Sequence, residues 1–133
     1  MPAPAGGKRF RYNTPMKTQI SRVLASRSDV LFGYLFGSYA EGTPSEYSDV
    51  DVAIYFTDEE IDTRLDLIHQ LEKQLHKKID LLDLNRTQNI YLLDTIIRKG
   101  IVVKDHPSRS RYELNKWQEI NDFLETKRYI DAA

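Results

Sequence analysis

Two different periods of apolar residues run along the chain, and they divide it into strands and helices. Short runs of apolar, β-branched and aromatic residues predict four strands, at 30–36, 50–56, 78–84 and 101–104. Segments with an apolar residue at every third or fourth position predict four helices, at 16–26, 57–77, 87–99 and 108–130. This alternation predicts an α+β fold, in which a small mixed sheet has helices packed on one face.

The predicted strand at 50–56 shows how the two faces of the sheet are expected to differ. Successive side chains of a strand point to opposite faces. One face therefore carries four apolar side chains, those of Val50, Val52, Ile54 and Phe56. The other face carries Asp49 and Asp51, followed by Ala53 and Tyr55. We expect helices to cover the first face and acidic chemistry to lie on the second.

Two of the predicted helices carry apolar stripes that are expected to pack on the sheet. The helix at 57–77 begins at Thr57, with Glu60 as its capping-box partner. Its buried stripe is expected to consist of Ile61, Leu65, Ile68, Leu71 and Leu75. The helix at 108–130 is expected to close over the sheet, and a partner-binding face is the alternative for its apolar residues Trp117, Ile120 and Leu124.

Length and composition fit one globular domain and exclude several kinds of site. The chain has 133 residues, of which 41% are hydrophobic and 29% are charged. It has no cysteine, which excludes disulfides, thiolate metal sites and a cysteine nucleophile and fits a cytoplasmic location. Its 19 basic and 20 acidic residues argue against a broad nucleic-acid surface, so no direct nucleic-acid binding is expected.

The first residues differ in composition from the rest of the chain. Residues 1–14 contain prolines, glycines and basic residues but no apolar h-region, so we expect a flexible tail rather than a signal peptide. The single domain is expected to span residues 15–133. No apolar run approaches the roughly 20 residues that cross a bilayer, and no membrane contact is expected.

The segment between the first two predicted strands carries a candidate phosphate-binding turn. Gly37 ends a strand, and Ser38 begins a segment that can form one helical turn closed by Gly42. A glycine lets the backbone approach a bulky anion, and a helix start offers a serine hydroxyl beside free backbone N–H groups. Alone, such a pair usually marks an ordinary turn. Its position between two strands and ahead of acidic residues favours a phosphate site.

Three aspartates are candidate metal ligands. Asp49 and Asp51 are two residues apart on a strand, so they share a face, with Cβ atoms roughly 6–7 Å apart. Adjacent carboxylates repel each other unless a cation lies between them, and Mg²⁺ is a hard cation that also binds phosphates. Asp80 lies in the apolar strand at 78–84 and is expected to join the pair, whereas Asp83 falls on the opposite face. Three carboxylates around one or two Mg²⁺ ions form a site for phosphoryl or nucleotidyl transfer.

The pattern of Gly37-Ser38, ten residues, then Asp49-Val50-Asp51 resembles the signature of the nucleotidyltransferase fold of the DNA polymerase β superfamily. The resemblance covers roughly residues 16–105 and is greatest to the minimal nucleotidyltransferases, among them the MntA-type antitoxins of HEPN/MNT toxin–antitoxin systems. Asp80 matches the family's third aspartate. The resemblance implies a nucleotidyltransferase-like sheet, with ATP and Mg²⁺ as cofactors. It also implies a HEPN-domain ribonuclease toxin as partner, silenced by transfer of AMP to one of its tyrosines.

The resemblance also implies roles for individual residues. Asp49 and Asp51 would bind both metal ions, and Asp80 would bind the catalytic metal and assist deprotonation of the acceptor hydroxyl. Gly37 and Ser38 would hold the β- and γ-phosphates of ATP. Glu41 departs from the family, in which many members carry a basic or neutral residue there, so we expect its side chain to point to solvent.

Two other functions compete with a protein adenylyltransferase antitoxin. A small-molecule nucleotidyltransferase, for example of the aminoglycoside type, is disfavoured because so short a chain offers no second domain for such a substrate. A non-catalytic antitoxin would neutralise its toxin by covering it. The intact Gly37-Ser38 and Asp49/Asp51 argue against that function, and Glu41 argues for it.

Overall fold

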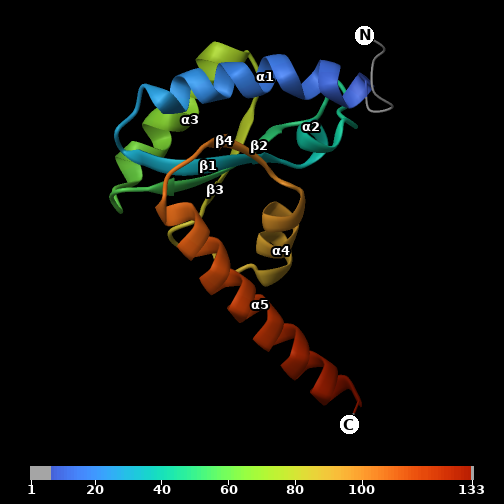
Figure 1. The fold of residues 1–133 in the computed structure, drawn as a ribbon. Coiled ribbons are helices and arrows are strands. Elements are labelled where there is room, and N and C mark those ends of the chain that lie inside the picture. Colours follow the sequence, from blue (N-terminus) through green and yellow to red (C-terminus); the bar gives the residue numbers. More distant parts are fainter. Residues whose placement is uncertain (1–6, 133) are drawn as a thin grey trace.

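The computed structural model describes the backbone of residues 7–132 and the side chains of residues 15–132. The elements follow in the order α1 (Gly7–Ala25), β1 (Val30–Phe36), α2 (Ser38–Glu41), β2 (Val50–Phe56), α3 (Ile61–Leu75), β3 (Ile79–Asp83), α4 (Ile90–Lys99), β4 (Ile101–Lys104) and α5 (Ser108–Ala132) (Figure 1). The predicted strands are confirmed, and β3 is shorter than predicted by one residue at each end. No described helix is long and apolar enough to pass through a bilayer.

The strands form one mixed sheet in the order β3-β2-β1-β4. β1 pairs antiparallel with β2 and with β4, and β2 pairs parallel with β3. Helix α3 supplies the long crossover that two parallel neighbours require. The predicted α+β class with a small mixed sheet is confirmed.

Helices cover both faces of the sheet, whereas the sequence analysis predicted cover on one face. Helices α1 and α3 lie on one side, and α4 with the first turns of α5 lies on the other (Figure 1). The first core contains the strand face predicted to be buried, that of Val50, Val52, Ile54 and Phe56. The second core contains Phe32, Tyr34 and Phe36. The cause is that β1 is apolar on both sides, so its aromatic face also requires cover.

Helix α1 begins earlier than predicted. The predicted helix began at 16 after a flexible tail over 1–14, whereas α1 begins at Gly7 and contains Pro15. Residues 1–6 lie outside the described residues. Residues 8–14 contain no glycine or proline that would stop a helix, and Pro15 removes only one backbone N–H donor from it.

The start of helix α3 is held by Asp58 rather than by the predicted Thr57 cap. One carboxylate oxygen of Asp58 accepts the backbone N–H of Glu60 at 2.9 Å, and the other accepts the hydroxyl of Thr63 at 3.0 Å. The predicted capping box between Thr57 and Glu60 is therefore wrong. Because Asp58 is one residue closer to the helix, its carboxylate reaches the first turn and Thr57 remains with the preceding strand.

The buried stripe of α3 is also displaced from the predicted one. Leu71 and Leu75 are buried as expected, but Ile61 and Leu65 are 63% and 57% exposed. Leu67 takes an inward position with them. In its first turns, the helix therefore turns toward the sheet a face that differs from the predicted one, so that Ile61 and Leu65 lie outside the contact.

Helix α5 leaves the body of the domain. Ile120 is its buried residue, while Trp117 and Leu124 are 40% and 37% exposed. Residues 121–132 are all exposed, and this part of the helix projects away from the sheet (Figure 1). The expected closure over the sheet is right for Ile120 and wrong for Trp117 and Leu124. Trp117 instead lines a hollow beside Ile97 and Arg98 of α4, and Phe123 contacts Tyr91 of α4, with ring centroids 5.7 Å apart.

Arg64 is a charged residue in the first core, only 5% exposed. Its guanidinium donates to Asp83 and to Asp58, at 2.9 Å in each case. It also lies over the ring of Phe56, at 4.1 Å from the ring centroid. Arg64 thereby joins α3 to the ends of β2 and β3 on the face opposite the acidic one.

We expect Arg64→Ala to lower the free energy of unfolding by about 2–3 kcal/mol. Removing one partner of a buried ion pair typically costs about 3–5 kcal/mol. The cost is smaller here because the side chains of Asp58 and Asp83 are 36% and 21% exposed. Urea unfolding measures the change. Arg98→Ala is the control, because it removes an exposed pair with Asp94 and should change the free energy by less than about 0.5 kcal/mol; equal losses would contradict the prediction.

Candidate active site

One edge of the sheet gathers the residues that the sequence analysis singled out. β1 ends there, and β2 begins there with Asp51 opposite Phe36. β3 runs parallel to β2 and places Asp80 opposite Asp51. β4 also begins at this edge, since it runs antiparallel to β1. We call the group at this place the aspartate edge, which consists of Gly37, Ser38, Asp49, Asp51 and Asp80.

Asp51 and Asp80 lie side by side within the aspartate edge. Their side chains are hydrogen-bonded to each other, and the charge of Asp49 also acts on Asp51. Burial, the charge of Asp80, this hydrogen bond and the charge of Asp49 together raise the pKa of Asp51 to about 6. A proton on Asp51 relieves the repulsion between its carboxylate and those of Asp80 and Asp49, which is why the protonated form of Asp51 is favoured.

The carboxylates of the aspartate edge have the chemistry to bind a hard cation, but their side chains are not arranged as a complete coordination shell. Within the described part of the chain, no group of three or more His, Cys, Asp or Glu side chains is arranged as a metal site. Like charges keep such side chains apart unless a proton or a cation lies between them. Carboxylate oxygens are the ligands that Mg²⁺ prefers. The three aspartates therefore supply a donor set for this ion.

Gly37 permits the close approach between β1 and Asp51. Its φ is 74°, in the left-handed region that side chains rarely adopt. A Cβ atom at this position would lie 2.1 Å from Oδ2 of Asp51. No other residue type therefore leaves Asp51 in place beside the end of β1.

Helix α2 is a single turn that begins at Ser38, as predicted. The backbone N–H groups of Ala40 and Glu41 donate to the carbonyl of Gly37, and Gly42 ends the turn with φ 76°. Buried Tyr39 and Ala40 fix the turn in the first core. The first N–H groups of a helix have no partner within it, so the turn places donors for an anion beside Asp51.

Asp83 and the two tyrosines next to the aspartate edge have different surroundings. Asp83 pairs with Arg64 on the opposite face, as the strand alternation predicted. Tyr39 is 5% exposed and belongs to the core, whereas Tyr47 is 86% exposed in the loop before Asp49.

Lys99 is a neighbour of the site that the sequence analysis did not single out. The expectation that Glu41 points to solvent is confirmed, and Lys99 lies 3.7 Å from its carboxylate. The sequence feature that could have indicated this contact is the connection of a single residue between the end of α4 at Lys99 and the start of β4 at Ile101. Antiparallel pairing of β4 with β1 brings that connection to the aspartate edge, but the sequence does not reveal which strand β4 joins.

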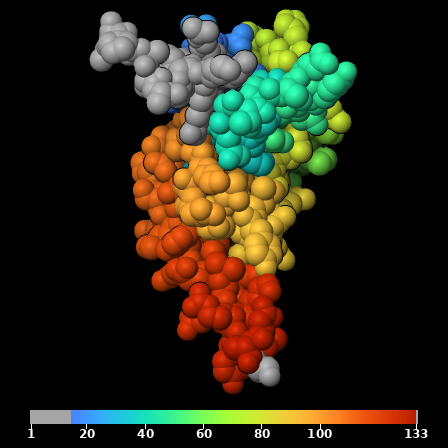
Figure 2. All heavy atoms as spheres, turned by 90° about the vertical axis from the view of Figure 1, so that its right-hand side faces the viewer, coloured from blue at the N-terminus to red at the C-terminus, as the bar shows by residue number. Residues whose placement is uncertain are grey.

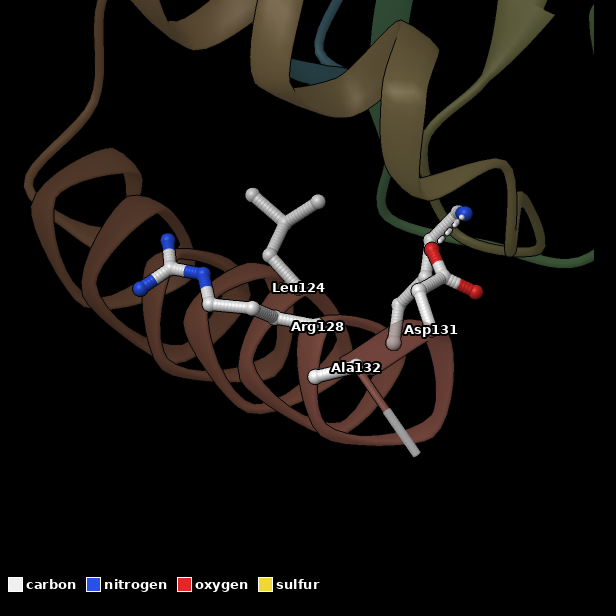
Figure 3. A pocket seen from close by; sticks show the side chains of 5 residues that line it. Leu124, Arg128, Asp131 and Ala132 are labelled. Carbon is white, nitrogen blue, oxygen red and sulfur yellow. Dashed lines mark hydrogen bonds and ion pairs between the residues drawn. The ribbon is translucent and has the colours of Figure 1, made fainter.

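Two hollows lie on other parts of the described surface. One of about 410 Å³ lies between α4 and α5, and is lined by Ile97, Arg98, Ser110, Glu113, Leu114 and Trp117. The other, of about 510 Å³, lies near the end of α5 and is lined by Leu124, Lys127, Arg128, Asp131 and Ala132. Figure 3 shows Leu124 between the charged ends of Arg128 and Asp131. Neither hollow includes a residue of the aspartate edge.

Comparison with known proteins identifies a family and two relatives. The family described as Polymerase beta, Nucleotidyltransferase matches residues 18–109, which include the whole aspartate edge. MJ1379 of Methanocaldococcus jannaschii, a provisionally assigned protein adenylyltransferase, is 35% identical over 78 residues, which are 56% of this chain and 78% of that protein. The protein adenylyltransferase MntA of Shewanella oneidensis is 36% identical over 69 residues, which are 50% of this chain and 48% of that protein.

Solved structures share the fold over most of their length. A chain of a crystal structure of a toxin–antitoxin with AMP-PNP has a TM-score of 0.73 at 22% identity, covering 87% of this chain and 95% of its own. A chain of the complex between tri-AMPylated Shewanella oneidensis HEPN toxin and MNT antitoxin has a TM-score of 0.68 at 19% identity, covering 90% and 96%. At these identities the likeness shows the fold.

We expect Gly37→Ala to displace Asp51 and to lower the free energy of unfolding by about 1–3 kcal/mol, the usual cost of a strained backbone position. The new Cβ cannot share space with the Asp51 carboxylate. Gly42→Ala is the control, because it replaces a second positive-φ glycine at the other end of α2, in the αL conformation, which an alanine tolerates better than the φ 74°, ψ −155° of Gly37. Urea unfolding and Mn²⁺ binding measure the two effects. Loss of Mn²⁺ binding should accompany Gly37→Ala alone, and equal loss in both variants would contradict the contact.

We expect the metal-free protein to lose stability as pH rises towards neutrality, relative to Asp51→Asn. The pKa of Asp51 is raised to about 6 in the folded protein. The protonated form is therefore favoured by folding, and this contribution is present below the ordinary pKa of about 4 and is lost as pH rises through about 6. Thermal melting in EDTA between pH 4 and 7.5 measures the difference between the two proteins.

Addition of Mg²⁺ should remove this loss in the wild type, because the cation replaces the proton between the carboxylates. Asp62→Asn, an exposed carboxylate at the start of α3, is the control and should follow the wild type at every pH. A constant difference between wild type and Asp51→Asn across the range would rule out the raised pKa.

Proposed function

Because this chain belongs to the polymerase beta nucleotidyltransferase family, we propose that it is an antitoxin that acts as a Mg²⁺-dependent protein adenylyltransferase. It transfers AMP from ATP to a tyrosine hydroxyl of a cognate HEPN ribonuclease toxin and so neutralises that toxin. The observation that carries the proposal is the parallel register of β2 and β3, which sets Asp80 beside Asp51 and next to the Gly37-Ser38 turn. A need for ATP and Mg²⁺ supports action in the cytoplasm.

The aspartates of this edge serve as the metal ligands in the proposed reaction. Asp49 and Asp51 would hold both ions, and Asp80 would hold the catalytic one. Mg²⁺ neutralises the phosphate charge and activates the attacking oxygen when it is bound. The closeness of Asp51 to Asp80 and the raised pKa of Asp51 support this assignment, because a cation between the carboxylates would relieve their repulsion and displace a proton from Asp51.

The turn at Gly37-Ser38 holds the leaving group in the same proposal. Backbone N–H groups at the start of α2 and the Ser38 hydroxyl donate to the β- and γ-phosphates. The acceptor oxygen attacks the α-phosphorus in line, the bond from that phosphorus to the bridging oxygen breaks, and pyrophosphate leaves. Asp80 takes the proton of the acceptor hydroxyl. The chain thus contributes positioning and charge neutralisation, as in other phosphoryl transfers.

The relatives support a protein as the acceptor. MJ1379 is provisionally assigned as a protein adenylyltransferase, and MntA carries the same name. A solved complex that contains a chain of this fold pairs a tri-AMPylated HEPN toxin with its MNT antitoxin. These names favour a HEPN toxin over a small molecule such as an aminoglycoside as the substrate of this chain.

Intact-mass spectrometry of a co-expressed HEPN toxin, after incubation with ATP and Mg²⁺, tests the function. We expect one or more adenylyl units on the toxin with the wild type and none with the double variant Asp49→Asn, Asp51→Asn, because that variant lacks the shared metal ligands. The control is Asp62→Asn, Asp66→Asn, which removes the same charge from two exposed carboxylates of α3 and should transfer AMP like the wild type.

Toxin activity in the same samples separates the remaining functions. If the Asp49→Asn, Asp51→Asn variant neutralises the toxin fully without any mass gain, the chain acts by covering its partner. If no protein gains mass while ATP is consumed with an added aminoglycoside, the chain is a small-molecule nucleotidyltransferase. Either result would overturn the proposed function.

A further inference from the structure

A charged hollow lies beside α2, next to the aspartate edge. It has a volume of about 510 Å³ and is lined by Glu41, Arg98, Lys99, Gly100 and Ile101. Ile101 pairs with Leu35, two residues before Gly37. The hollow therefore adjoins the phosphate-binding turn on the side of β4, while the aspartates lie on the side of β2. Figure 2 shows the cyan segment around residue 40 directly against the orange segment of α4.

The two cations of this hollow differ in how firmly they are held. Arg98 donates twice to Asp94 of its own helix, at 3.0 and 2.7 Å. Within residues 15–132, Lys99 forms one loose ion pair, 3.7 Å from Glu41, and both side chains are about half exposed at 54% and 43%. Exposed pairs of this kind contribute little stability, so a stronger anion can take the lysine from the glutamate.

Helix α2 holds Glu41 close to the place where the proposed function puts the triphosphate. Glu41 is the last residue of the single turn that Ser38 begins. An unpaired carboxylate there would repel the β- and γ-phosphates, whereas an ammonium group would attract them. Among the side chains that the structure describes, Lys99 is the cation that pairs with this carboxylate.

We propose that Lys99 is a substrate-binding residue that leaves Glu41 to contact the terminal phosphates of the nucleoside triphosphate. Glu41 then competes with the triphosphate for Lys99 and sets how tightly the nucleotide binds. The inference rests on the proposed function, because it takes the turn at Ser38 as the phosphate site. It concerns binding and specificity for a triphosphate tail, with no role in the chemical step.

The test compares the dissociation constants of a β,γ-imido analogue of ATP and of AMP, each with Mg²⁺, by calorimetry. Lys99→Ala should weaken binding of the triphosphate analogue about tenfold, the size of one hydrogen bond to a charged group. Binding of AMP, which lacks the β- and γ-phosphates, should change less than about twofold. Glu41→Gln should strengthen binding of the analogue, because it removes both the competition for Lys99 and a negative charge beside the phosphates.

Lys77→Ala is the matched control. The Lys77 ammonium lies 5.7 Å from the ring centroid of Tyr39, so it also adjoins α2, but it does not line the hollow. It should leave both dissociation constants near those of the wild type. Equal weakening by Lys77→Ala and Lys99→Ala, or equal effects of Lys99→Ala on the analogue and on AMP, would overturn the inference.

The outcomes for the inference and for the proposed function are distinct. If the wild type binds no triphosphate analogue, the proposed function fails. If the wild type binds the analogue and Lys99→Ala binds it equally well, the proposed function stands and the role of Lys99 is wrong.

Discussion

Repulsion between carboxylates at one edge of a rigid sheet is the constraint around which this molecule is built. The parallel pairing of β2 and β3 fixes Asp51 opposite Asp80, and neither backbone can move without breaking the ladder on which both cores rest. The contact of Asp51 with Gly37 leaves the carboxylate no room to retreat towards β1. The cost appears as the raised pKa of Asp51. The two hydrophobic cores, one on each face of the sheet, offset the unfavourable free energy of placing these carboxylates close together.

The opposite face of the same strands shows how the protein separates structural charge from functional charge. Arg64 satisfies Asp83 and Asp58 there with short, directed hydrogen bonds. The aspartate edge has no comparable fixed cation among its described neighbours, and Lys99 is only loosely paired. One set of carboxylates is thus neutralised by the chain itself, and the other is available to the metal ions of the proposed function. A cation that bound the second set would relieve repulsion that the fold leaves in place, and its binding would therefore stabilise the folded protein.

Local sequence patterns were sufficient for some features of the site and insufficient for others. Gly37 and Ser38 mark their turn by residue type, and strand alternation alone puts Asp80 and Asp83 on opposite faces. The position of α5 could not be predicted, because its apolar residues fit a core and an exposed surface equally well. The helices on the second face of the sheet were not predicted, because the aromatic side chains of β1 were not recognised as a second surface that needs burial. The position of Lys99 beside the site depends on the pairing of β4 with β1, which is a long-range contact that no local sequence pattern indicates.

Helix α5 divides the molecule into a part whose sequence is constrained by packing and a part whose sequence is not. Beyond Ile120 its side chains are exposed. Phe123 still contacts the ring of Tyr91 on α4, and farther out Lys127 pairs with Asp131 on the next turn of the same helix. Such a segment is held by local interactions of small size. Substitutions there leave the sheet and its aspartates untouched. The surface of the outer helix can therefore diverge in evolution at a different rate from the chemistry, which stays fixed by the register of two strands.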